Sequence, residues 1–524
     1  MSKNQTSGNR MFRAAGVVAL FFLLTRFFGL LKVSAISNYY GINVEADAFY
    51  LALRLPDLLF GIVAGGALGS AFIPTFSGYL AKDDEQAGWD LFSAVLNLIL
   101  LLMVVLAGLA AIFTESIIYQ LYIDISKPDW EETLRLAVPM TRVMLLSIVI
   151  FGASGLFMAA LNAKQHFFAP AVAGVLYNLG IILGTVFFAP NIMGAAWGAV
   201  IGAALHALVQ IPALLQNGVR YRPIFQTGDG GVRQVLTLMG PRIVGLSFSY
   251  LNPFIVPTLA RSMLTGTVAG LNNANQIMLV PYSLLGQAVG VVSFPTMAAL
   301  AAEGNHTEMR RILTSALRSI LFLGLPMTIG LILLRRPTVM LLLERGEFTS
   351  ADTDFVSGLL FFYALAILPL AGLEVIARAF YSLQDTWTPV IAALVQLPVM
   401  IGLSILFAFQ LFPAAGLDPA GGIALGFSLS NWIEVIVLVF LLRNKLNGIG
   451  AADLIDGAWR MGVAAAVMIP AVVFTLRFIP FESPLILIPA GGAVGVLVYF
   501  GVSQLLAIRE LVRFTQPLLR RLGR

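Results

Sequence analysis

Apolar stretches of about 20 residues, separated by short polar or Pro/Gly-containing segments, recur along the whole chain. A helix needs about 20 apolar residues to cross the hydrocarbon core of a bilayer. The pattern therefore predicts fourteen membrane-spanning helices. Their expected ranges are 14–36, 46–77, 88–113, 134–161, 169–189, 192–215, 233–258, 268–300, 309–334, 354–383, 389–411, 420–442, 457–479 and 484–507.

The composition agrees with this pattern. With 59% hydrophobic and 11% charged residues among 524, the chain is too apolar for a soluble protein of its length, so we expect an all-α polytopic membrane protein. The chain has no cysteine, and its three histidines lack the spacing of a metal site. Phosphate-binding loops, dinucleotide fingerprints and a Ser/His/Asp set in a plausible context are missing from the sequence as well. We therefore expect a protein that is not an enzyme and has no cofactor.

Basic residues are distributed unevenly between the two sets of loops. The loops on the N-terminal side of the fourteen predicted helices carry 17 Lys and Arg residues, and the opposite loops carry 6. Loops rich in Lys and Arg stay in the cytoplasm. The asymmetry predicts that both termini are cytoplasmic. The net charge of +5 is thus a topology signal, and we expect no nucleic-acid partner.

Two pairs of segments resemble each other. MAALNAKQHFFAPAV, between the fourth and fifth predicted helices, resembles ARAFYSLQDTWTPVI, between the tenth and eleventh, at an offset of 219 residues. LPDLLFGIVAGGALGSAFIPT in the second helix resembles VPYSLLGQAVGVVSFPT in the eighth. Because six helices separate the copies, equivalent helices run in the same direction. We expect two parallel six-helix lobes, 1–216 and 217–445, and two further helices with a basic tail in 446–524.

Ionisable residues interrupt the first two predicted helices. Charges at bilayer depth cost about 2.5–3.5 kcal/mol on insertion scales and usually face a bundle interior or a water-filled cavity. The candidates for a substrate site are therefore Arg26, Lys32, Asp47, Arg54 and Asp57. On a helix the last three fall within a stripe roughly 80° wide. The alternative is that Asp47 and Arg54 form a buried pair that only fixes helix packing.

Polar residues also occur in the second predicted lobe. Arg242 lies beside a proline near the start of the seventh helix, and Gln276 lies in the first half of the eighth, so both are candidates for the substrate cavity. Glu374 and Arg378 stand at i and i+4 in the tenth helix, which favours an ion pair within that helix. Glu434 is a weaker candidate for a proton or cation site.

Several motifs together resemble the MviN/MurJ family, within the superfamily of multidrug and lipid-linked oligosaccharide exporters. They are TRFFGLLK, ADAFYLALRLPDLL, GALGSAFIPTF, LMGPRIVG, ERGEFTSADT and ARAFYSLQDTWTPV, and the resemblance extends from about residue 12 to at least residue 445. It implies a fourteen-helix flippase of the bacterial inner membrane. Such a protein moves lipid II, the undecaprenyl-diphosphate-linked peptidoglycan precursor, from the cytoplasmic to the periplasmic leaflet.

The resemblance also implies a cationic central cavity for the diphosphate and a lateral groove, lined partly by the last two helices, for the lipid tail. Arg26 matches an arginine of the family's first-helix motif. Lys32 matches a second arginine, with the charge kept and the planar fork lost. Asp47 matches the aspartate of a DAF motif, and Arg54 stands where a basic residue is common.

The chain departs from the family pattern at four positions. Phe60 and Gly61 stand where many members have two arginines, and Gly65 stands where they have a glutamate. Gln276 replaces a further cavity arginine. These losses weaken the prediction of a diphosphate substrate, although Arg242 or Arg54 could compensate.

Other functions stay open at this stage. The chain could move a related lipid-linked oligosaccharide, or it could be a cation-coupled multidrug antiporter. An antiporter for cationic drugs needs an acidic cavity, whereas the candidate site contains more basic than acidic side chains. A scaffold without transport activity, which recruits cell-wall enzymes, would also fit the missing arginines.

Without an ATP site, transport would have to be driven by an ion gradient or by the membrane potential, which is worth about 2.3 kcal/mol per charge per 100 mV. The expected partners are the anionic lipid-linked substrate, membrane lipids and the cell-wall synthesis machinery.

Overall fold

The structure is a computed structural model that describes residues 21, 23–63, 67–225, 230–249, 251–480 and 482–512. Inside the helices, the side chains of 63, 67, 68, 70, 240–249 and 252 lie outside the described part. Every regular element in the described ranges is helical, so the prediction of an all-α protein is confirmed.

The first described helix covers residues 23–40. The helices that follow are α2 (Val44–Val63), α3 (Ala67–Leu80), α4 (Glu85–Tyr122), α5 (Trp130–Ala163), α6 (Phe168–Phe188), α7 (Met193–Leu208), α8 (Ile211–Gln216), α9 (Gly230–Ser249), α10 (Asn252–Ala260), α11 (Thr267–Ala302), α12 (His306–Leu333), α13 (Arg335–Leu343), α14 (Ser350–Ala364), α15 (Ile367–Ser382), α16 (Trp387–Leu406), the π-helical turn η1 (Phe407–Leu411), α17 (Phe412–Ala414), α18 (Pro419–Lys445), α19 (Ala451–Phe478) and α20 (Pro484–Leu505).

Helices lie at all fourteen predicted spans, although several spans are divided. In the described ranges, eleven helices, some of them joined pairs, are long and apolar enough to cross a membrane. The sixth predicted span consists of α7 and α8, and the tenth consists of α14 and α15. Two predicted boundaries differ clearly from the structure, and both lie at the longer loops. There α4 continues to Tyr122, and the short α13 begins at Arg335 in a segment expected to be a loop.

Polar side chains cap the N-termini of several helices. Asp84, Asn305 and Asp418 each accept a hydrogen bond from a backbone N–H in the first turn of the following helix. Thr349 and Asp352 form a reciprocal capping box at the start of α14. Such caps satisfy backbone donors that have no partner inside the helix.

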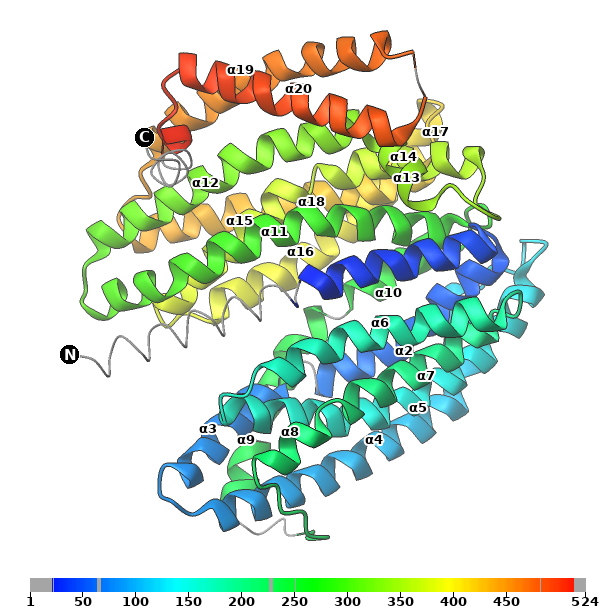
Figure 1. Cartoon of the computed structure of the whole chain (residues 1–524), viewed down its shortest axis with the longest axis vertical. Helices are drawn as coiled ribbons and strands as arrows, with labels where there is room; N and C mark the ends of the chain where they lie inside the picture. Colours follow the sequence, from blue (N-terminus) through cyan, green and yellow to red (C-terminus); the bar gives the residue numbers. More distant parts are fainter. Residues whose placement is uncertain are drawn as a thin grey trace. The chain divides into compact units, whose positions relative to one another are not determined.

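One compact unit comprises residues 1–269 together with 345–348. Its main core is aromatic: the rings of Phe72 and Phe76 on α3 stack 5.1 Å apart, and Phe76 packs edge-on against Trp89 of α4 at 5.2 Å. Within this unit, α4 and α5 lie side by side, as do α6 and α7 (Figure 1).

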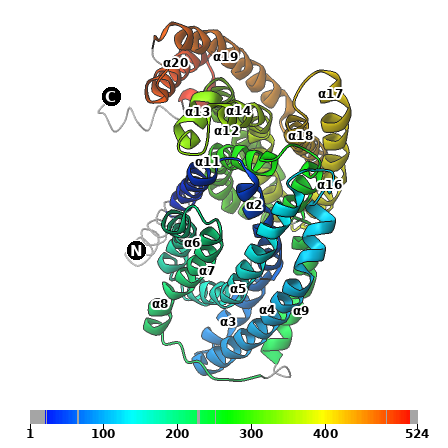
Figure 2. The same cartoon turned by 90° about the vertical axis from the view of Figure 1, so that its right-hand side faces the viewer.

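The other compact unit comprises residues 270–344 and 349–524. In its described part, Phe322 of α12 packs with Met461 and Met468 of α19 and with Tyr499 of α20. The Tyr499 hydroxyl donates to the backbone oxygen of Phe322 at 2.8 Å. The helices α19 and α20 run side by side (Figure 2). The last two helices therefore pack as part of this unit. The division of the chain into two six-helix lobes with boundaries at 216/217 and 445/446 concerns the sequence repeat, and it stays a prediction.

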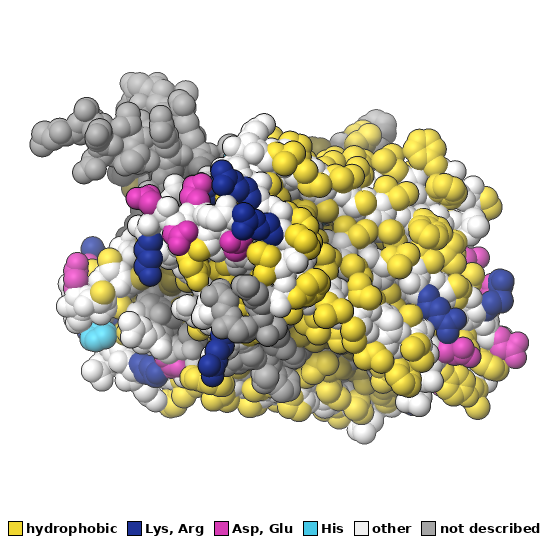
Figure 3. Space-filling model, turned by 90° about the horizontal axis from the view of Figure 1, so that it is seen from below, with side chains coloured by type: hydrophobic (Ala, Val, Ile, Leu, Met, Phe, Trp, Pro, Cys, Tyr) yellow, Lys and Arg dark blue, Asp and Glu magenta, His cyan; other side chains and the backbone are white. Residues whose placement is uncertain are grey.

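The outer surfaces of the long helices are apolar. On α4, Leu101, Val104, Ile112 and Phe113 are each more than half exposed. Figure 3 shows hydrophobic side chains in a broad band on one face of the protein, with charged side chains gathered toward the two ends of that face. A broad exposed apolar band is what lipid tails cover, so this surface fits a bilayer.

The predicted repeat is visible in the backbone of two turns. The turn between α5 and α6 and the turn between α15 and α16 begin and end 219 residues apart. Gln165 and Gln384, which the sequence comparison aligned, both have φ of 58°. The backbone N–H groups of His166 and Asp385 then bond to equivalent carbonyls five residues earlier, at 2.8 and 3.0 Å. Each unit therefore contains the same helix–turn–helix element.

Glycine allows α6 and α7 to approach closely. A Cβ atom on Gly180 would lie 2.3 Å from the Cα of Gly202, and a Cβ atom on Gly184 would lie 2.6 Å from the Cα of Gly198. Small residues that let backbones meet are the usual means of helix association in membranes.

This contact makes a prediction about stability. Gly180→Ala places its methyl group against backbone that cannot move aside, so we expect a loss of about 1–3 kcal/mol. Gly108→Ala on α4 is the matched control, because a Cβ atom there meets nothing within 4 Å. The thermal midpoint of the detergent-solubilised protein measures the effect. Equal midpoints for the two variants would contradict close packing of α6 on α7.

Candidate functional site

The polar side of α2 differs in exposure along its length. Asp47 and Tyr50, near its start, are buried, with 6% and 2% of their surface exposed. Arg54 is half-buried and Asp57 is exposed. Residues three apart on a helix lie on the same side. The predicted stripe is therefore closed at Asp47 and accessible at Asp57.

Lys32 of the first helix lies near the accessible end of this stripe. Its strongest charge interaction is with Asp57, followed by one with Arg54. Lys32 and Arg54 are both half-buried. The structure thus brings together three of the residues predicted from the sequence, which we call the α2 charge cluster: Lys32, Arg54 and Asp57. It has two positive charges and one negative charge, so its excess charge suits an anion.

Asp47 is bound by backbone groups. Its Oδ2 accepts a hydrogen bond from Gly266 N and its Oδ1 accepts one from Ala269 N, both at 2.7 Å. Ala269 lies in the first turn of α11, where N–H groups have no partner inside the helix and a negative charge is favourable. The structure therefore gives Asp47 a capping role, and a contact with substrate stays a prediction.

Gly266 makes this capping contact possible. It has φ of +85°, and a Cβ atom there would lie 1.8 Å from the backbone oxygen of Ile42. Only glycine fits such an approach without strain.

Three aromatic rings pack in a row that ends near Asp57 of the α2 charge cluster. Phe60, on α2, packs against Phe151 at a centroid distance of 4.7 Å, and Phe151 packs edge-on against Tyr177 of α6 at 5.0 Å. Tyr177 is close enough to Asp57 to interact with its charge. Phe60 stands at the position where the family resemblance implies an arginine, so this chain has an apolar ring at that place.

The other predicted site residues lie at separate places. Arg26 is half-buried on the first helix, six residues before Lys32 and so about 9 Å along the axis. Arg242 lies on α9, and its side chain is outside the described part. Gln276 is half-buried on α11, in the other compact unit. Gly65 lies outside the described residues.

The predicted pair Glu374–Arg378 is confirmed, with Arg378 Nη1 at 2.6 Å from Glu374 Oε2. Two residues of α11 extend it: Tyr282 Oη donates to Glu374 Oε1 at 2.8 Å, and Gln287 Nε2 donates to the same oxygen at 3.1 Å. Arg378 Nη2 donates in turn to Gln287 Oε1 at 3.2 Å. Sequence reasoning missed Tyr282 and Gln287, although both stand in the VPYSLLGQ segment that it had aligned with the second helix.

Gly290 of α11 leaves room for the Arg378 side chain of this network. A Cβ atom on Gly290 would lie 2.2 Å from Arg378 Nη1, so the guanidinium occupies the space of an absent side chain. The side chains of this network come from two helices, α11 and α15. They supply hydrogen bonds to the charges of Glu374 and Arg378, which lipid tails cannot do.

The side chains of the α2 charge cluster are suited to binding an anion. Among the described residues, no three His, Cys, Asp or Glu side chains are placed to hold a metal ion. The α2 charge cluster offers an ammonium and a guanidinium, and a guanidinium can donate two parallel hydrogen bonds to a phosphate. The arrangement can hold a charged headgroup by ionic hydrogen bonds and release it, without forming a covalent bond to it.

The capping role of Asp47 can be tested by substitution. Asp47→Ala removes two hydrogen bonds to a charged acceptor, each worth about 1.5–3 kcal/mol, and leaves the two N–H groups without an acceptor. We expect a lower thermal midpoint, and a smaller decrease for Asp47→Asn, which keeps one acceptor oxygen. Glu115→Ala, at an exposed position of α4, is the control and should leave the midpoint nearly unchanged. A fully stable Asp47→Ala variant with impaired transport would instead indicate substrate binding.

Comparison with known proteins agrees with this architecture. The model of the family "Lipid II flippase MurJ" matches residues 36–487. A "Lipid II flippase MurJ" from Burkholderia cenocepacia is 27% identical over 443 residues, covering 83% of this chain and 84% of the relative. A "Probable lipid II flippase MurJ" from Vibrio cholerae is 28% identical over 417 residues, covering 77% of this chain and 79% of the relative.

Solved structures share the fold. A lipid II flippase MurJ in an inward closed conformation superposes with a TM-score of 0.78 at 24% identity, covering 96% of this chain and 99% of that chain. An inward-facing multidrug transporter of the MATE family has a TM-score of 0.70 at 16% identity, covering 81% of this chain and 94% of that chain. The family match spans most of the chain, and the resemblance seen in its motifs is confirmed: this protein belongs to the family of MurJ lipid II flippases.

Proposed function

We propose that this protein moves lipid II from the cytoplasmic to the periplasmic leaflet of the bacterial inner membrane by alternating access. The observation that carries the proposal is the family match over residues 36–487, which includes both units. The α2 charge cluster supports it, because a lipid-linked diphosphate is an anion and the cluster has an excess of positive charge.

The missing family arginines change which side chains would bind the diphosphate. Phe60 packs against Phe151 and adds no charge. The binding of phosphate oxygens therefore falls to Lys32, Arg54 and Arg26. The same losses favour, as a second candidate, a related lipid-linked oligosaccharide with fewer phosphate contacts. A cation-coupled drug antiporter is disfavoured by the sign of the cluster.

A lipid tail needs an apolar path beside the polar cavity, because exposing many CH₂ groups to water costs about 0.8 kcal/mol each. The second unit contains an apolar groove of about 280 Å³ between α12, α19 and α20. Its wall includes Met327, Met468, Gly492, Val496 and Phe500. We assign the polyprenyl tail to this groove, in line with the lateral groove that the family resemblance implies.

We also propose that both termini are cytoplasmic, which follows from the asymmetry of Lys and Arg between the loops. Transport would be driven by an ion gradient or by the membrane potential. The product reaches the leaflet where peptidoglycan is polymerised, so the enzymes that consume it are the expected partners.

The function can be tested by depleting the protein from its own bacterium and measuring lipid II on each side of the inner membrane. Depletion should cause lipid II to accumulate in the cytoplasmic leaflet, and the wild-type gene should reverse this. Arg26→Ala should fail to reverse it at normal protein abundance, because a charge-assisted hydrogen bond of about 1.5–3 kcal/mol is lost. Arg26→Lys should restore export in part, since the charge remains without the planar fork.

Two controls separate binding by Arg26 from a structural role. Arg443→Ala changes an exposed arginine at the end of α18 and should support normal export. If Arg26 instead has a structural role, Arg26→Ala should lower protein abundance and the thermal midpoint, and the loss of export should follow the loss of folded protein. Normal export by a well-expressed Arg26→Ala variant would exclude Arg26 from the site, and unchanged lipid II after depletion would refute the flippase function.

The orientation makes a separate prediction. Reporter fusions at Gly304 and Gly448 should have cytoplasmic activity, and fusions at Lys127 and Gly416 should have periplasmic activity. All four positions lie between described helices. The reverse pattern would overturn the proposed topology and leave the fold unaffected.

A further inference from the structure

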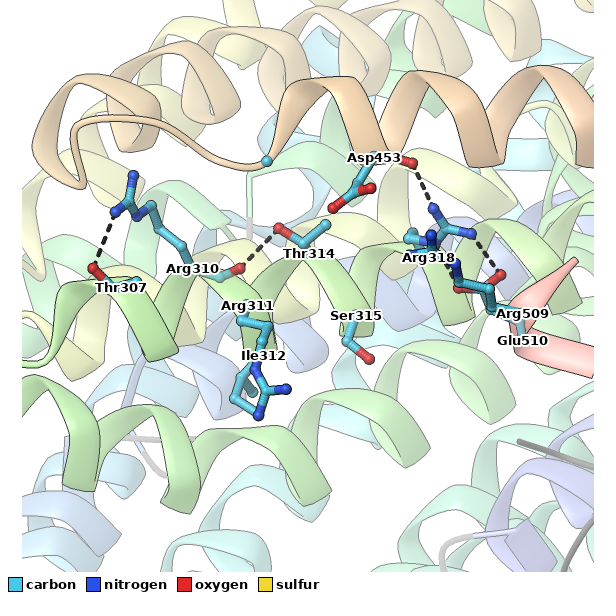
Figure 4. Close-up of a pocket in the computed structure, with 11 residues that line it drawn as sticks. Thr307, Arg310, Arg311, Ile312, Thr314, Ser315, Arg318, Asp453, Arg509 and Glu510 are labelled. Atoms are coloured by element: carbon cyan, nitrogen blue, oxygen red, sulfur yellow. Dashed lines mark hydrogen bonds and ion pairs between the residues drawn. The ribbon is translucent and has the colours of Figure 1, made fainter. Parts of the chain in front are cut away.

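A polar cavity of about 520 Å³ lies in the second unit, at the end where α12 and α19 begin and α20 ends. Arg310, Thr314 and Arg318 of α12 line it, together with Gly450 at the start of α19 and Arg509 after α20. Figure 4 shows Arg310 and Arg318 at opposite ends of this stretch of α12, with Thr314 between them. Eight residues of helix separate the two arginines by about 12 Å. The cavity is thus wider than a single small ion.

One end of the cavity is fixed by a buried ion pair. Arg318 Nε and Nη2 donate to the two carboxylate oxygens of Glu510 at 2.5 and 2.8 Å, and Arg318 Nη1 donates to the backbone oxygen of Asp453 at 2.6 Å. Glu510 is 1% exposed, and Ile508 is also buried. Arg509 stands between these two anchored residues, so its backbone is held at the cavity.

The other end is fixed by the loop before α19. Arg310 Nη1 donates to the backbone oxygen of Asn447 at 3.0 Å, and Thr314 Oγ1 donates to that of Ile449 at 2.8 Å. Gly450 follows with φ of +66°, and no side chain caps the N-terminus of α19 there. The first N–H groups of a helix carry partial positive charge and favour anions.

The side chains that remain for a ligand are mainly cationic. Arg509 is exposed and makes no hydrogen bond or ion pair with any residue in the described ranges. A guanidinium has five N–H donors, and Arg310 uses two of them, on Asn447 and Thr307. Arg311 is paired with Glu308 at 2.8 Å. The carboxylate of Asp453 opposes these charges from the first turn of α19.

Arg318 is paired with Glu510, and Arg311 is paired with Glu308. The remaining charged residues of the lining are Arg310 and Arg509 against Asp453, an excess of one positive charge. Guanidinium groups and the free N–H groups of a helix N-terminus are both common binding groups for phosphate. We propose that this cavity binds a phosphate-bearing anion. Its length fits a headgroup larger than inorganic phosphate. The anion could be supplied by an anionic phospholipid of the membrane or by a soluble phosphate compound. The residues differ from those of the α2 charge cluster, so the inference is independent of the transported substrate.

The test uses the full-length protein, purified in detergent and freed of lipid. Dissociation constants are measured for dioctanoyl phosphatidylglycerol, dioctanoyl phosphatidylcholine and inorganic pyrophosphate, by native mass spectrometry for the lipids and by calorimetry for pyrophosphate. Arg509→Gln removes the cation that has no partner among the described residues, and Arg443→Gln removes an exposed arginine of the same unit that lies outside the cavity. Thermal midpoints confirm that both variants are folded.

We expect Arg509→Gln to weaken binding of the anion about tenfold or more, whereas Arg443→Gln changes it less than about twofold. Binding of phosphatidylglycerol over both phosphatidylcholine and pyrophosphate would identify a lipid headgroup, and preferential binding of pyrophosphate would identify a soluble ligand. The proposal is overturned if neither anion binds, if phosphatidylcholine binds as tightly as phosphatidylglycerol without pyrophosphate binding, or if the two variants weaken binding equally.

Discussion

The interior of this protein depends on one constraint: a charged side chain within its helices must be stabilised by hydrogen bonds or an opposite charge from the protein. Hydrocarbon supplies no hydrogen bonds, and an unpaired charge there costs several kcal/mol. The structure meets this constraint in three ways. Asp47 accepts hydrogen bonds from two backbone N–H groups, Glu374 forms an ion pair with a guanidinium one helical turn away, and Lys32 interacts with the opposite charge of Asp57. The first two arrangements leave little capacity for a ligand, whereas the third has a half-buried and accessible excess of positive charge.

The sequence separation between each charge and its stabilising partner explains which contacts could be predicted. The helices were predictable because an apolar run of about 20 residues has few alternatives to a membrane span. The Glu374–Arg378 pair was predictable because its partners are four residues apart on one helix. Capping by Asp47 was not predictable, since its partners are backbone groups 219 and 222 residues away and backbone groups leave no trace in side-chain identity. The pairing of Arg318 with Glu510 was missed because the two residues are 192 positions apart in the sequence.

The broken spans show a second limit of the sequence pattern. Hydropathy does not distinguish a continuous helix from two helices joined within the membrane, because both contain the same residues. The tenth span was predicted as one helix, yet α14 ends at Ala364 and α15 begins at Ile367. Trp432 of α18 donates to the backbone oxygen of Leu365 at 3.0 Å, and Ser428 donates to that of Phe362 at 2.7 Å. Side chains of a neighbouring helix thus satisfy carbonyl groups that the break releases.

In the repeated turn, the two units share the backbone conformation but differ in their charged residues. Gln165 and Gln384 share a left-handed backbone, which sets the direction of the next helix in each unit. The charges around the two turns differ. In the first unit, Lys164 pairs with Glu85 at 2.8 Å, whereas in the second the turn carries the acid Asp385, which pairs with a lysine of α18.

Partial burial alone would raise the pKa of Asp385, but hydrogen bonds from Lys445 and Thr388 outweigh it and lower the pKa to about 2. Asp385 is therefore ionised at any physiological pH, as an ion pair at this turn requires. Each turn thus has its own ion pair, with the basic partner on the turn in one unit and on a neighbouring helix in the other. The backbone of the turn is common to both units because it determines how the helices pack. Either arrangement of charge gives the charged side chain of the turn an oppositely charged partner.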